Sequence, residues 1–362
     1  MPKAKTKLDS LIRYAEFLGY GAIHTKIDKE TGLQAIIAIH NLNRGPAIGG
    51  CRFLSYGSMH DAYKDAIRLG YMMSYKAAIT NLPHGGAKSV IIKPPVIKNR
   101  EALFAKFAEF IHGLGGQYIT AVDSGTSTAD MDIIEKYTPY VTCTTKLGGG
   151  GDPSPLTALG VRRAIQAAVK FKYDQASLTG IHVAIQGAGH VGYYLAKECH
   201  ALGARLTVTD INELVLKRCA EEFGATICGL DDIYSLDADV FSPCALGAVL
   251  NLKNIKKLKA KIVAGSANNQ LSHAHYGTLL HELDILYAPD FLINSGGLIH
   301  VATAYDHGSM EKSLAQINNI YHTVYDIFER SRAQNIATSK VAEIIALERI
   351  YQKKESSNLI AM

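Results

Sequence analysis

The sequence contains no long apolar run, no leader-like segment and little excess of charge. No stretch of about 18 consecutive apolar residues occurs, so we predict no membrane-spanning helix. The N-terminus carries lysines but no continuous apolar segment after them, which argues against a signal peptide. The net charge of +5 is small, and basic and acidic residues are interspersed, so we expect no binding to nucleic acid.

Cysteine is scarce, and the spacing of the cysteines does not indicate a metal site. The 6 cysteines occur singly, without a Cys-x-x-Cys pair, as is typical of buried thiols in a reducing compartment. His273, His275 and His281 lie close together, but no His-Glu-x-x-His motif accompanies them, so we interpret them as surface or helix-capping residues. The sequence therefore predicts a cytoplasmic protein without a metal site.

What is present is the pattern of an α/β protein of two domains, at roughly 100–200 residues per domain. Short β-branched runs alternate with helical periods from about residue 33 onward. The first part contains predicted strands at 34–40, 89–93, 117–121 and 141–144, and predicted helices at 58–74, 99–113 and 127–137. Gly148–Gly151 and the Asp-Pro-Ser-Pro segment after them then interrupt any regular element and mark a domain boundary.

A second α/β unit follows this boundary. Its predicted strands lie near 181–186, 205–209, 238–242, 261–264 and 285–287. From about residue 309 the pattern is helical, in two long segments split near 334–338. We expect a first domain at 1–147, which the C-terminal helices at 333–362 rejoin, and a second domain at 148–332.

The clearest motif is a Gly-x-Gly-x-x-Gly frame formed by Gly187, Gly189 and Gly192 after an apolar strand. The first glycine permits a tight turn, the second lets a pyrophosphate approach the backbone, and the third allows close packing of helix on strand. Asp210 follows 23 residues after Gly187, where an acid binds the adenosine ribose and repels a 2′-phosphate. We therefore predict a Rossmann-type domain that binds NAD; alternatively, Asp210 caps the next helix together with Asn212.

Two further segments carry glycines and lysines that a purely structural role explains poorly. These are GPAIGGCR at 45–52 and MSYKAAITNLPHGGAKSVI at 73–91, in which Lys76 and Lys88 lie 12 residues apart. A lysine that enters an apolar strand either extends out to solvent or lies in a cleft. The residues alone leave both interpretations open.

The order of several motifs resembles one enzyme family. GPAIGG, MSYKAA, GGAKSVII, AVDSGT, DPSPLTALGV, SPCALGA, AGSANNQL and YAPDFLINSGGLIHV occur in turn between about residues 33 and 350. The chain resembles the glutamate/leucine/phenylalanine/valine dehydrogenases, most closely the leucine and phenylalanine branch. The resemblance implies that NAD and water convert an L-amino acid to a 2-oxo acid and ammonium. It also implies a homo-oligomer, either an octamer or a dimer, with substrate binding in the first domain.

The resemblance also implies roles for individual residues. Lys88 would activate the attacking water, Asp123 would exchange protons with the amine, and Lys76 would bind the substrate carboxylate. Other implied substrate contacts are Gly49, Gly50 and Asn269. The implied cofactor contacts are Thr157, Gly187, Gly189, His190, Val191, Gly192, Asp210 and Asn268. On a structural interpretation, Asp123 would be a turn residue, and Asn268 and Asn269 would cap a loop.

The aligned lining of the side-chain pocket is apolar, and it consists of Ile48, Ala121, Leu298 and Val301. Without a cation there, glutamate is not expected. Leucine, valine and isoleucine are the leading substrates, with phenylalanine or tryptophan as the alternative. A hydroxy-acid dehydrogenase would leave the two lysines and Asp123 unexplained, and a non-catalytic NAD-binding homologue would not need them. Ala87 stands where the family usually has a glycine before the lysine, so its methyl group is expected to narrow the pocket or shift Lys88.

Overall fold

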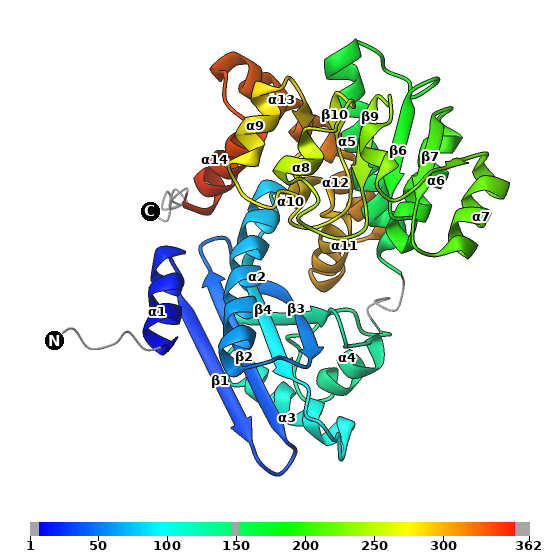
Figure 1. Cartoon of the computed structure of the whole chain (residues 1–362). Helices are drawn as coiled ribbons and strands as arrows, with labels where there is room; N and C mark the ends of the chain where they lie inside the picture. Colours follow the sequence, from blue (N-terminus) through cyan, green and yellow to red (C-terminus); the bar gives the residue numbers. More distant parts are fainter. Residues whose placement is uncertain (1–6, 147–151, 352–362) are drawn as a thin grey trace.

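A computed structural model of the chain describes residues 7–146 and 152–351 and contains two domains, each built on its own β-sheet (Figure 1). The two-domain α/β architecture predicted from the sequence is therefore confirmed. The glycine run at 148–151 lies outside the described residues, and the exact division at 147/148 and 332/333 stays a prediction.

The N-terminal domain contains a 5-stranded mixed sheet in the order β1-β2-β4-β3-β5. β4, β3 and β5 run parallel, whereas β2 is antiparallel to β4 and β1 is antiparallel to β2. The strands are β1 (Ala22–Asp28), β2 (Leu33–Asn41), β3 (Ala47–Leu54), β4 (Gly85–Ile92) and β5 (Tyr118–Val122). The helices are α1 (Lys7–Phe17), α2 (Met59–Ile79), α3 (Arg100–His112) and α4 (Thr128–Glu135).

Helices cover both faces of this sheet, and the side chains of the central strands point alternately to one face and to the other. Ile36, Ala38 and Val90 pack with α1 and α2, whereas their neighbours Ile37 and Ile91 pack with α3 and α4. Successive side chains of a strand point to opposite faces, so each strand contributes to two apolar layers. Lys88 shares the face of Val90 and therefore lies on the side of α2.

The predicted elements of this domain are partly correct. The three predicted helices are confirmed, although α2 extends to Ile79 and thus carries Lys76. The predicted strand at 141–144 is wrong, because Val141 forms only an isolated bridge with Thr120. The sequence analysis missed β1 and β3, and β3 contains the glycine pair of the GPAIGG segment.

The second domain contains a 6-stranded parallel sheet in the order β11-β10-β9-β6-β7-β8. This is the strand order of a dinucleotide-binding Rossmann fold, in which ligands bind where the order reverses, here between β6 and β9. The strands are β6 (His182–Gln186), β7 (Arg205–Thr209), β8 (Thr226–Ile227), β9 (Val240–Pro243), β10 (Ile262–Val263) and β11 (Leu286–Tyr287). Its helical elements up to α10 are α5 (Ser154–Tyr173), α6 (His190–Ala201), α7 (Glu213–Phe223), the 3₁₀ turn η1 (Asp232–Ser235), α8 (Leu252–Ile255), α9 (Tyr276–Glu282) and α10 (Asp290–Ile293).

The C-terminal helices connect the two domains. They are α11 (Gly296–Tyr305), α12 (Met310–Asn318), α13 (Ile320–Gln334) and α14 (Thr338–Tyr351). Asn335 ends α13 in a left-handed conformation, at the break predicted from the sequence. α14 then packs against α2, where Arg349 Nη1 donates to the carbonyl oxygen of Ile79 at 2.5 Å.

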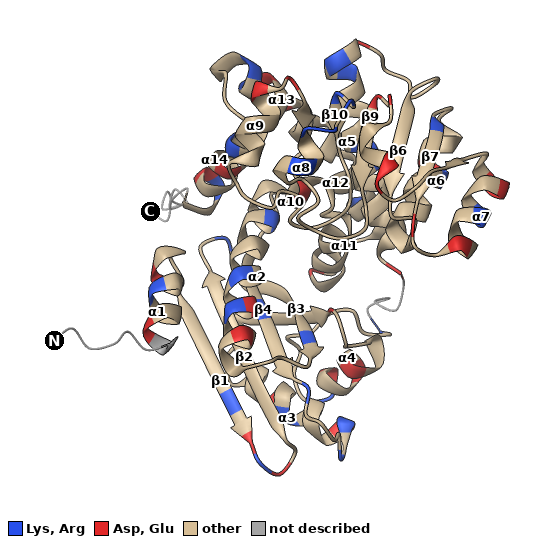
Figure 2. Cartoon of the chain, viewed as in Figure 1, with Lys and Arg blue, Asp and Glu red and all other residues tan. Residues whose placement is uncertain are grey.

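Charged residues of both signs occur in both domains (Figure 2). Among the residues that the structure describes, no helix combines the length and apolarity needed to cross a bilayer.

Candidate active site

A cleft of about 490 Å³ lies between the two domains. Residues from β3, β4, β5 and α2 line one side, and residues from α5, α11 and the loop after β10 line the other. Many of the residues singled out in the sequence meet here. They are Ile48, Gly49, Gly50, Lys76, Lys88, Ala121, Asp123, Thr157, Asn268, Asn269, Leu298 and Val301.

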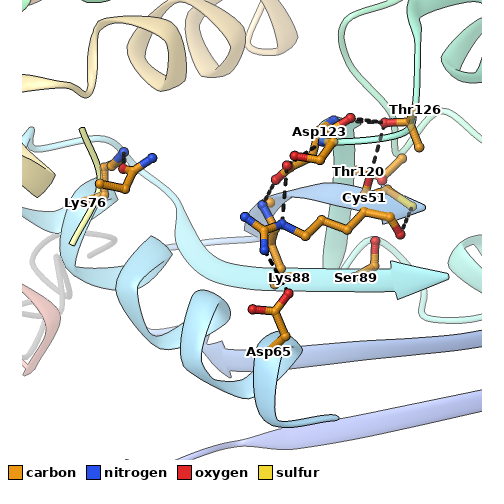
Figure 3. A network of polar contacts seen from close by, with 12 residues as sticks. Cys51, Asp65, Lys76, Lys88, Ser89, Thr120, Asp123 and Thr126 are labelled. Atoms are coloured by element: carbon orange, nitrogen blue, oxygen red, sulfur yellow. Dashed lines mark hydrogen bonds and ion pairs between the residues drawn. The ribbon is translucent and has the colours of Figure 1, made fainter. Parts of the chain in front are cut away.

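Lys88 and Asp123 form an ion pair at the floor of the cleft (Figure 3). Lys88 projects from β4 and is only 6% exposed, and its Nζ donates to Oδ2 of Asp123. Asp123 follows β5, and its Oδ1 accepts a hydrogen bond from the backbone N–H of Ser124 at 2.5 Å. Burial favours the neutral carboxyl, but the Lys88 ammonium and the Arg52 guanidinium outweigh it and hold the pKa of Asp123 well below its usual range. Asp123 is therefore a carboxylate at neutral pH.

The glycine pair of β3 makes room for this ion pair. A Cβ at Gly50 would lie 2.8 Å from Cβ of Asp123, so only glycine allows the aspartate its position. A Cβ at Gly49 would lie 1.8 Å from the carbonyl oxygen of Ala87 on the neighbouring strand β4. Gly50 therefore accommodates a reactive group, whereas Gly49 permits strand pairing.

Ala87 does not narrow the cleft, and the expected shift of Lys88 stays a prediction. The Ala87 side chain is fully buried on the sheet face opposite Lys88, in the apolar cluster that includes Phe104 and Ile37. The methyl group is not part of the cleft lining, so it does not narrow the pocket. The alternation of side chains along β4 explains the difference.

Lys76 approaches the cleft from the last turn of α2. Its side chain is half-buried, and its Nζ lies 3.5 Å from Oδ1 of Asn268 in the second domain (Figure 3). Oδ1 of Asn268 also accepts a hydrogen bond from Nδ2 of Asn294 at 2.8 Å. Burial lowers the pKa of Lys76 to about 8, against the opposing effect of Asp290. The ammonium group is thus held in a poorly solvated place suited to an anionic ligand.

The sequence analysis missed several lining residues. Arg52 and Asp290 belong to the quoted motifs GPAIGGCR and YAPDFLINSGG, yet neither was assigned a role. Asp290 is 8% exposed and accepts backbone hydrogen bonds from Gln270 and Phe291 at 2.9 and 2.7 Å. Their place in these motifs was the only sequence signal that could have singled out Arg52 and Asp290. The contacts that they make are formed only in the folded chain.

The glycine-rich turn lies apart from this cleft, at the carboxyl ends of β6 and β7. Gly187 has φ +92°, and a Cβ at Gly192 would lie 1.9 Å from the carbonyl oxygen of Gly187, so both positions require glycine. A Cβ at Gly189 would meet nothing within 4 Å, which leaves this side of the turn open to a ligand. His190 and Val191 begin α6, whose N-terminus suits a diphosphate.

Asp210 supports this turn directly. Its Oδ2 accepts the backbone N–H of Ala188 at 2.7 Å, and its Oδ1 accepts that of Asn212 at 2.9 Å. Asn212, not Asp210, caps α7 through the N–H of Leu214 at 3.1 Å. The turn, the helix N-terminus and the acid at the end of β7 together fit a dinucleotide.

Comparison with known proteins agrees with this geometry. Residues 21–140 match the model of the "Glu/Leu/Phe/Val dehydrogenase, dimerisation domain", and residues 148–220 and 215–357 match that of the "Glutamate/Leucine/Phenylalanine/Valine dehydrogenase". The chain belongs to the Glu/Leu/Phe/Val dehydrogenase family. As a member of this family, it is an amino acid dehydrogenase, an oxidoreductase with a nicotinamide dinucleotide cofactor.

Individual Glu/Leu/Phe/Val dehydrogenases are similar over most of their length. A leucine dehydrogenase of Geobacillus stearothermophilus is 46% identical over 94% of this chain and 93% of its own. An L-tryptophan dehydrogenase of Nostoc punctiforme is 40% identical over 91% of this chain and 93% of its own. The crystal structure of L-tryptophan dehydrogenase from Nostoc punctiforme superposes with a TM-score of 0.85 at 38% identity, covering 95% of this chain and 100% of that one.

Proposed function

We propose that the chain catalyses the NAD-dependent, reversible oxidative deamination of an apolar L-amino acid, with leucine, valine and isoleucine as the leading substrates. The observation that carries this proposal is that the lining of one cleft combines a charged part with an apolar part. Lys76, Lys88 and Asp123 provide the charged part, and the apolar part consists of Ile48, Ala121, Leu298 and Val301. A zwitterionic backbone and an apolar side chain match these two parts.

The charged part accounts for the handling of the substrate backbone. Lys76 would bind the α-carboxylate and so fix the orientation of Cα. Asp123, held as a carboxylate, would accept a proton from the incoming ammonium group, because deamination requires the neutral amine. Once it has released its own proton to solvent, Lys88 would serve as the base toward the water that attacks the iminium carbon. Gly49, Gly50 and Asn269 would complete the contacts with the substrate.

The glycine-rich turn around Gly189 supports the proposal that the chain uses NAD. When bound, NAD would accept the hydride that leaves Cα. Gly187, Gly189, His190, Val191 and Gly192 would hold its diphosphate, Asp210 its adenosine ribose, and Asn268 and Thr157 its nicotinamide half. The carboxylate of Asp210 would bring like charge to a 2′-phosphate bound beside it, which supports the proposal of NAD rather than NADP.

The test is an initial-rate panel with the purified protein at alkaline pH. NADH formation is followed with NAD or NADP and with leucine, valine, isoleucine, phenylalanine, tryptophan or glutamate, with 2-hydroxy acids as the control for reaction class. We expect turnover of an aliphatic amino acid with NAD. Turnover of phenylalanine or tryptophan alone would establish the alternative function, an aromatic L-amino acid dehydrogenase. Lys88→Ala should abolish turnover and leave NAD binding nearly intact, and turnover by this variant would contradict the assigned base.

We also infer a homo-oligomer. The family model that matches residues 21–140 is described as a dimerisation domain. In that segment β1 forms an edge of the N-terminal sheet and carries Ile27 at 60% exposure, and Phe17 of the preceding α1 is 85% exposed. An unpaired strand edge beside exposed apolar groups supports association with a second copy. Analytical ultracentrifugation of the purified protein measures its oligomeric state.

A further inference from the structure

Arg52 connects Asp123 to a residue outside the cleft. Arg52 lies on β3, two residues after Gly50. Its guanidinium group lies between two carboxylates. Nη1 is 2.8 Å from Oδ2 of Asp65 on α2, and Nε is 3.4 Å from Oδ1 of Asp123. Asp123 therefore faces a different cation with each oxygen, Lys88 at Oδ2 and Arg52 at Oδ1.

Asp65 is itself firmly held. Its Oδ2 also accepts a hydrogen bond from the hydroxyl of Tyr56 at 2.9 Å, and its Oδ1 accepts one from Nη2 of Arg68 at 3.1 Å. The side chain is 17% exposed and is not part of the cleft lining. Asp65 thus does not contact a substrate bound in the cleft, whereas its partner Arg52 lines that cleft.

The Nε–H of Arg52 is buried and, among the described residues, has no acceptor within hydrogen-bond geometry. Oδ1 of Asp123, at 3.4 Å, is a carboxylate oxygen just beyond a good hydrogen bond. A buried donor without an acceptor is unfavourable, so a small shift of the carboxylate toward Arg52 would complete this bond. The Asp123 carboxylate can make this shift when the Lys88 side chain turns away from it toward water or substrate.

We propose that Arg52, anchored by Asp65, is a positioning residue that holds the Asp123 carboxylate and provides its hydrogen bond whenever Lys88 leaves it. This inference rests on the proposed function, because it takes Asp123 as the group that exchanges protons with the amine. An arginine suits this position because its planar guanidinium group carries several N–H donors, so that Nη1 faces Asp65 while Nε faces Asp123.

The experiment compares Arg52→Gln, Arg52→Lys and Asp65→Asn in the full-length protein, with leucine and NAD. We expect Arg52→Gln to lower kcat by at least about 10-fold, with KM for leucine within about 2-fold, because the substrate contacts remain and only the carboxylate is misplaced. Loss of the positive charge also raises the pKa of Asp123, so the acid limb of the kcat profile moves to higher pH. Asp65→Asn keeps the charge of Arg52 and removes a nearby negative charge, so we expect a weaker loss of kcat without a shift of the acid limb to higher pH.

The conservative variant separates charge from geometry. Arg52→Lys keeps a cation, so its acid limb should stay close to that of the wild type while kcat recovers only in part. Arg162→Gln is a matched control, because Arg162 pairs with Glu198 at 3.2 Å within the second domain. It should leave kcat and the pH profile unchanged. If Arg52→Gln does not fold, Arg52→Lys and Asp65→Asn still decide the question.

Three outcomes would overturn the inference or its premise. Wild-type kcat and pH profiles in Arg52→Gln and Asp65→Asn, together with an inactive Asp123→Asn, would refute the role of Arg52 alone. A rise in KM of more than about 10-fold at unchanged kcat would mean that Arg52 binds the substrate carboxylate directly. Full activity of Asp123→Asn would instead refute the proposed function of Asp123, on which the inference depends.

Discussion

At the scale of single residues, the cleft holds cations in two different ways. Lys88 is neutralised by Asp123, whereas Lys76 has, among the residues that the structure describes, only the amide oxygen of Asn268 within hydrogen-bond distance. Burial without a matching carboxylate contact is what lowers the pKa of Lys76 to about 8, from an ordinary value of 10.5. A ligand that brings its own carboxylate would restore the missing partner, which explains why a desolvated lysine is useful at this position.

This difference predicts how ligand binding depends on pH. Below about pH 8 Lys76 is charged, and above it the fraction of charged Lys76 falls. Affinity for a carboxylate should therefore be constant up to about pH 8 and then weaken by up to about 10-fold per pH unit. The inhibition constant of 4-methylpentanoate measures this directly, because that ligand lacks the amine, whose own titration would otherwise interfere.

The matched variant for this prediction is Lys76→Arg, whose side chain stays charged throughout. If it still binds 4-methylpentanoate, its inhibition constant should not change between pH 6 and pH 10. A wild-type inhibition constant that is equally flat to pH 10 would show that the charge of Lys76 does not control carboxylate binding.

At the scale of elements, the sequence predicted helices and the cofactor turn better than the strands of the N-terminal sheet. α4 was predicted because its N-terminal capping interactions are local: Ser127 Oγ accepts the N–H of Asp130, and the carboxylate of Asp130 accepts the N–H of Ser127. β3 was missed because its glycines at 49 and 50 read as a loop, and these glycines are needed for contacts with Ala87 and Asp123 that are distant in sequence. The partnership of Arg52 with Asp65 was invisible for the same reason.

The two adjacent glycines of β3 give a prediction that separates function from folding. In Gly50→Ala the new methyl group meets the side chain of Asp123, so the protein should fold but lose at least about 10-fold in kcat. In Gly49→Ala the methyl group meets the backbone of β4 at 1.8 Å, so the paired strands must separate and the thermal midpoint should fall sharply. Steady-state kinetics and thermal unfolding of both variants provide the comparison. Equal losses of stability in the two variants would contradict the assignment.

At the scale of the whole molecule, the cleft exists because α11 of the C-terminal part faces the N-terminal sheet. α11 presents Leu298 and Val301 to the cleft, and the carbonyl oxygen of Val301 accepts the hydroxyl of Thr142 at 3.2 Å. The sequence predicted both sides of this pocket only through the family resemblance. Periodicity alone does not show which domain surfaces meet, because those contacts join residues more than 150 positions apart.

A buried histidine fixes the far end of α11 to the N-terminal domain. His84 is 2% exposed; its Nε2 lies 2.9 Å from Oδ2 of Asp306, which ends α11, and its Nδ1 lies 3.2 Å from the carbonyl oxygen of Pro46. Asp306→Ala would leave a buried ring nitrogen without a partner, at a cost of about 1–3 kcal/mol. Because the same helix carries Leu298 and Val301, the contact fixes one wall of the cleft as well as the domain arrangement.

We therefore expect Asp306→Ala to lower the thermal midpoint by a few degrees and to raise KM for the amino acid more than it changes kcat. His84→Phe preserves an aromatic ring beside Tyr305, whose ring centroid lies 6.3 Å from that of His84. In the double variant no buried ring nitrogen is left without a partner, so the combined shift of the midpoint should be smaller than the sum of the two single shifts. Strictly additive shifts, with KM unchanged in Asp306→Ala, would mean that this contact does not hold the two domains around the cleft.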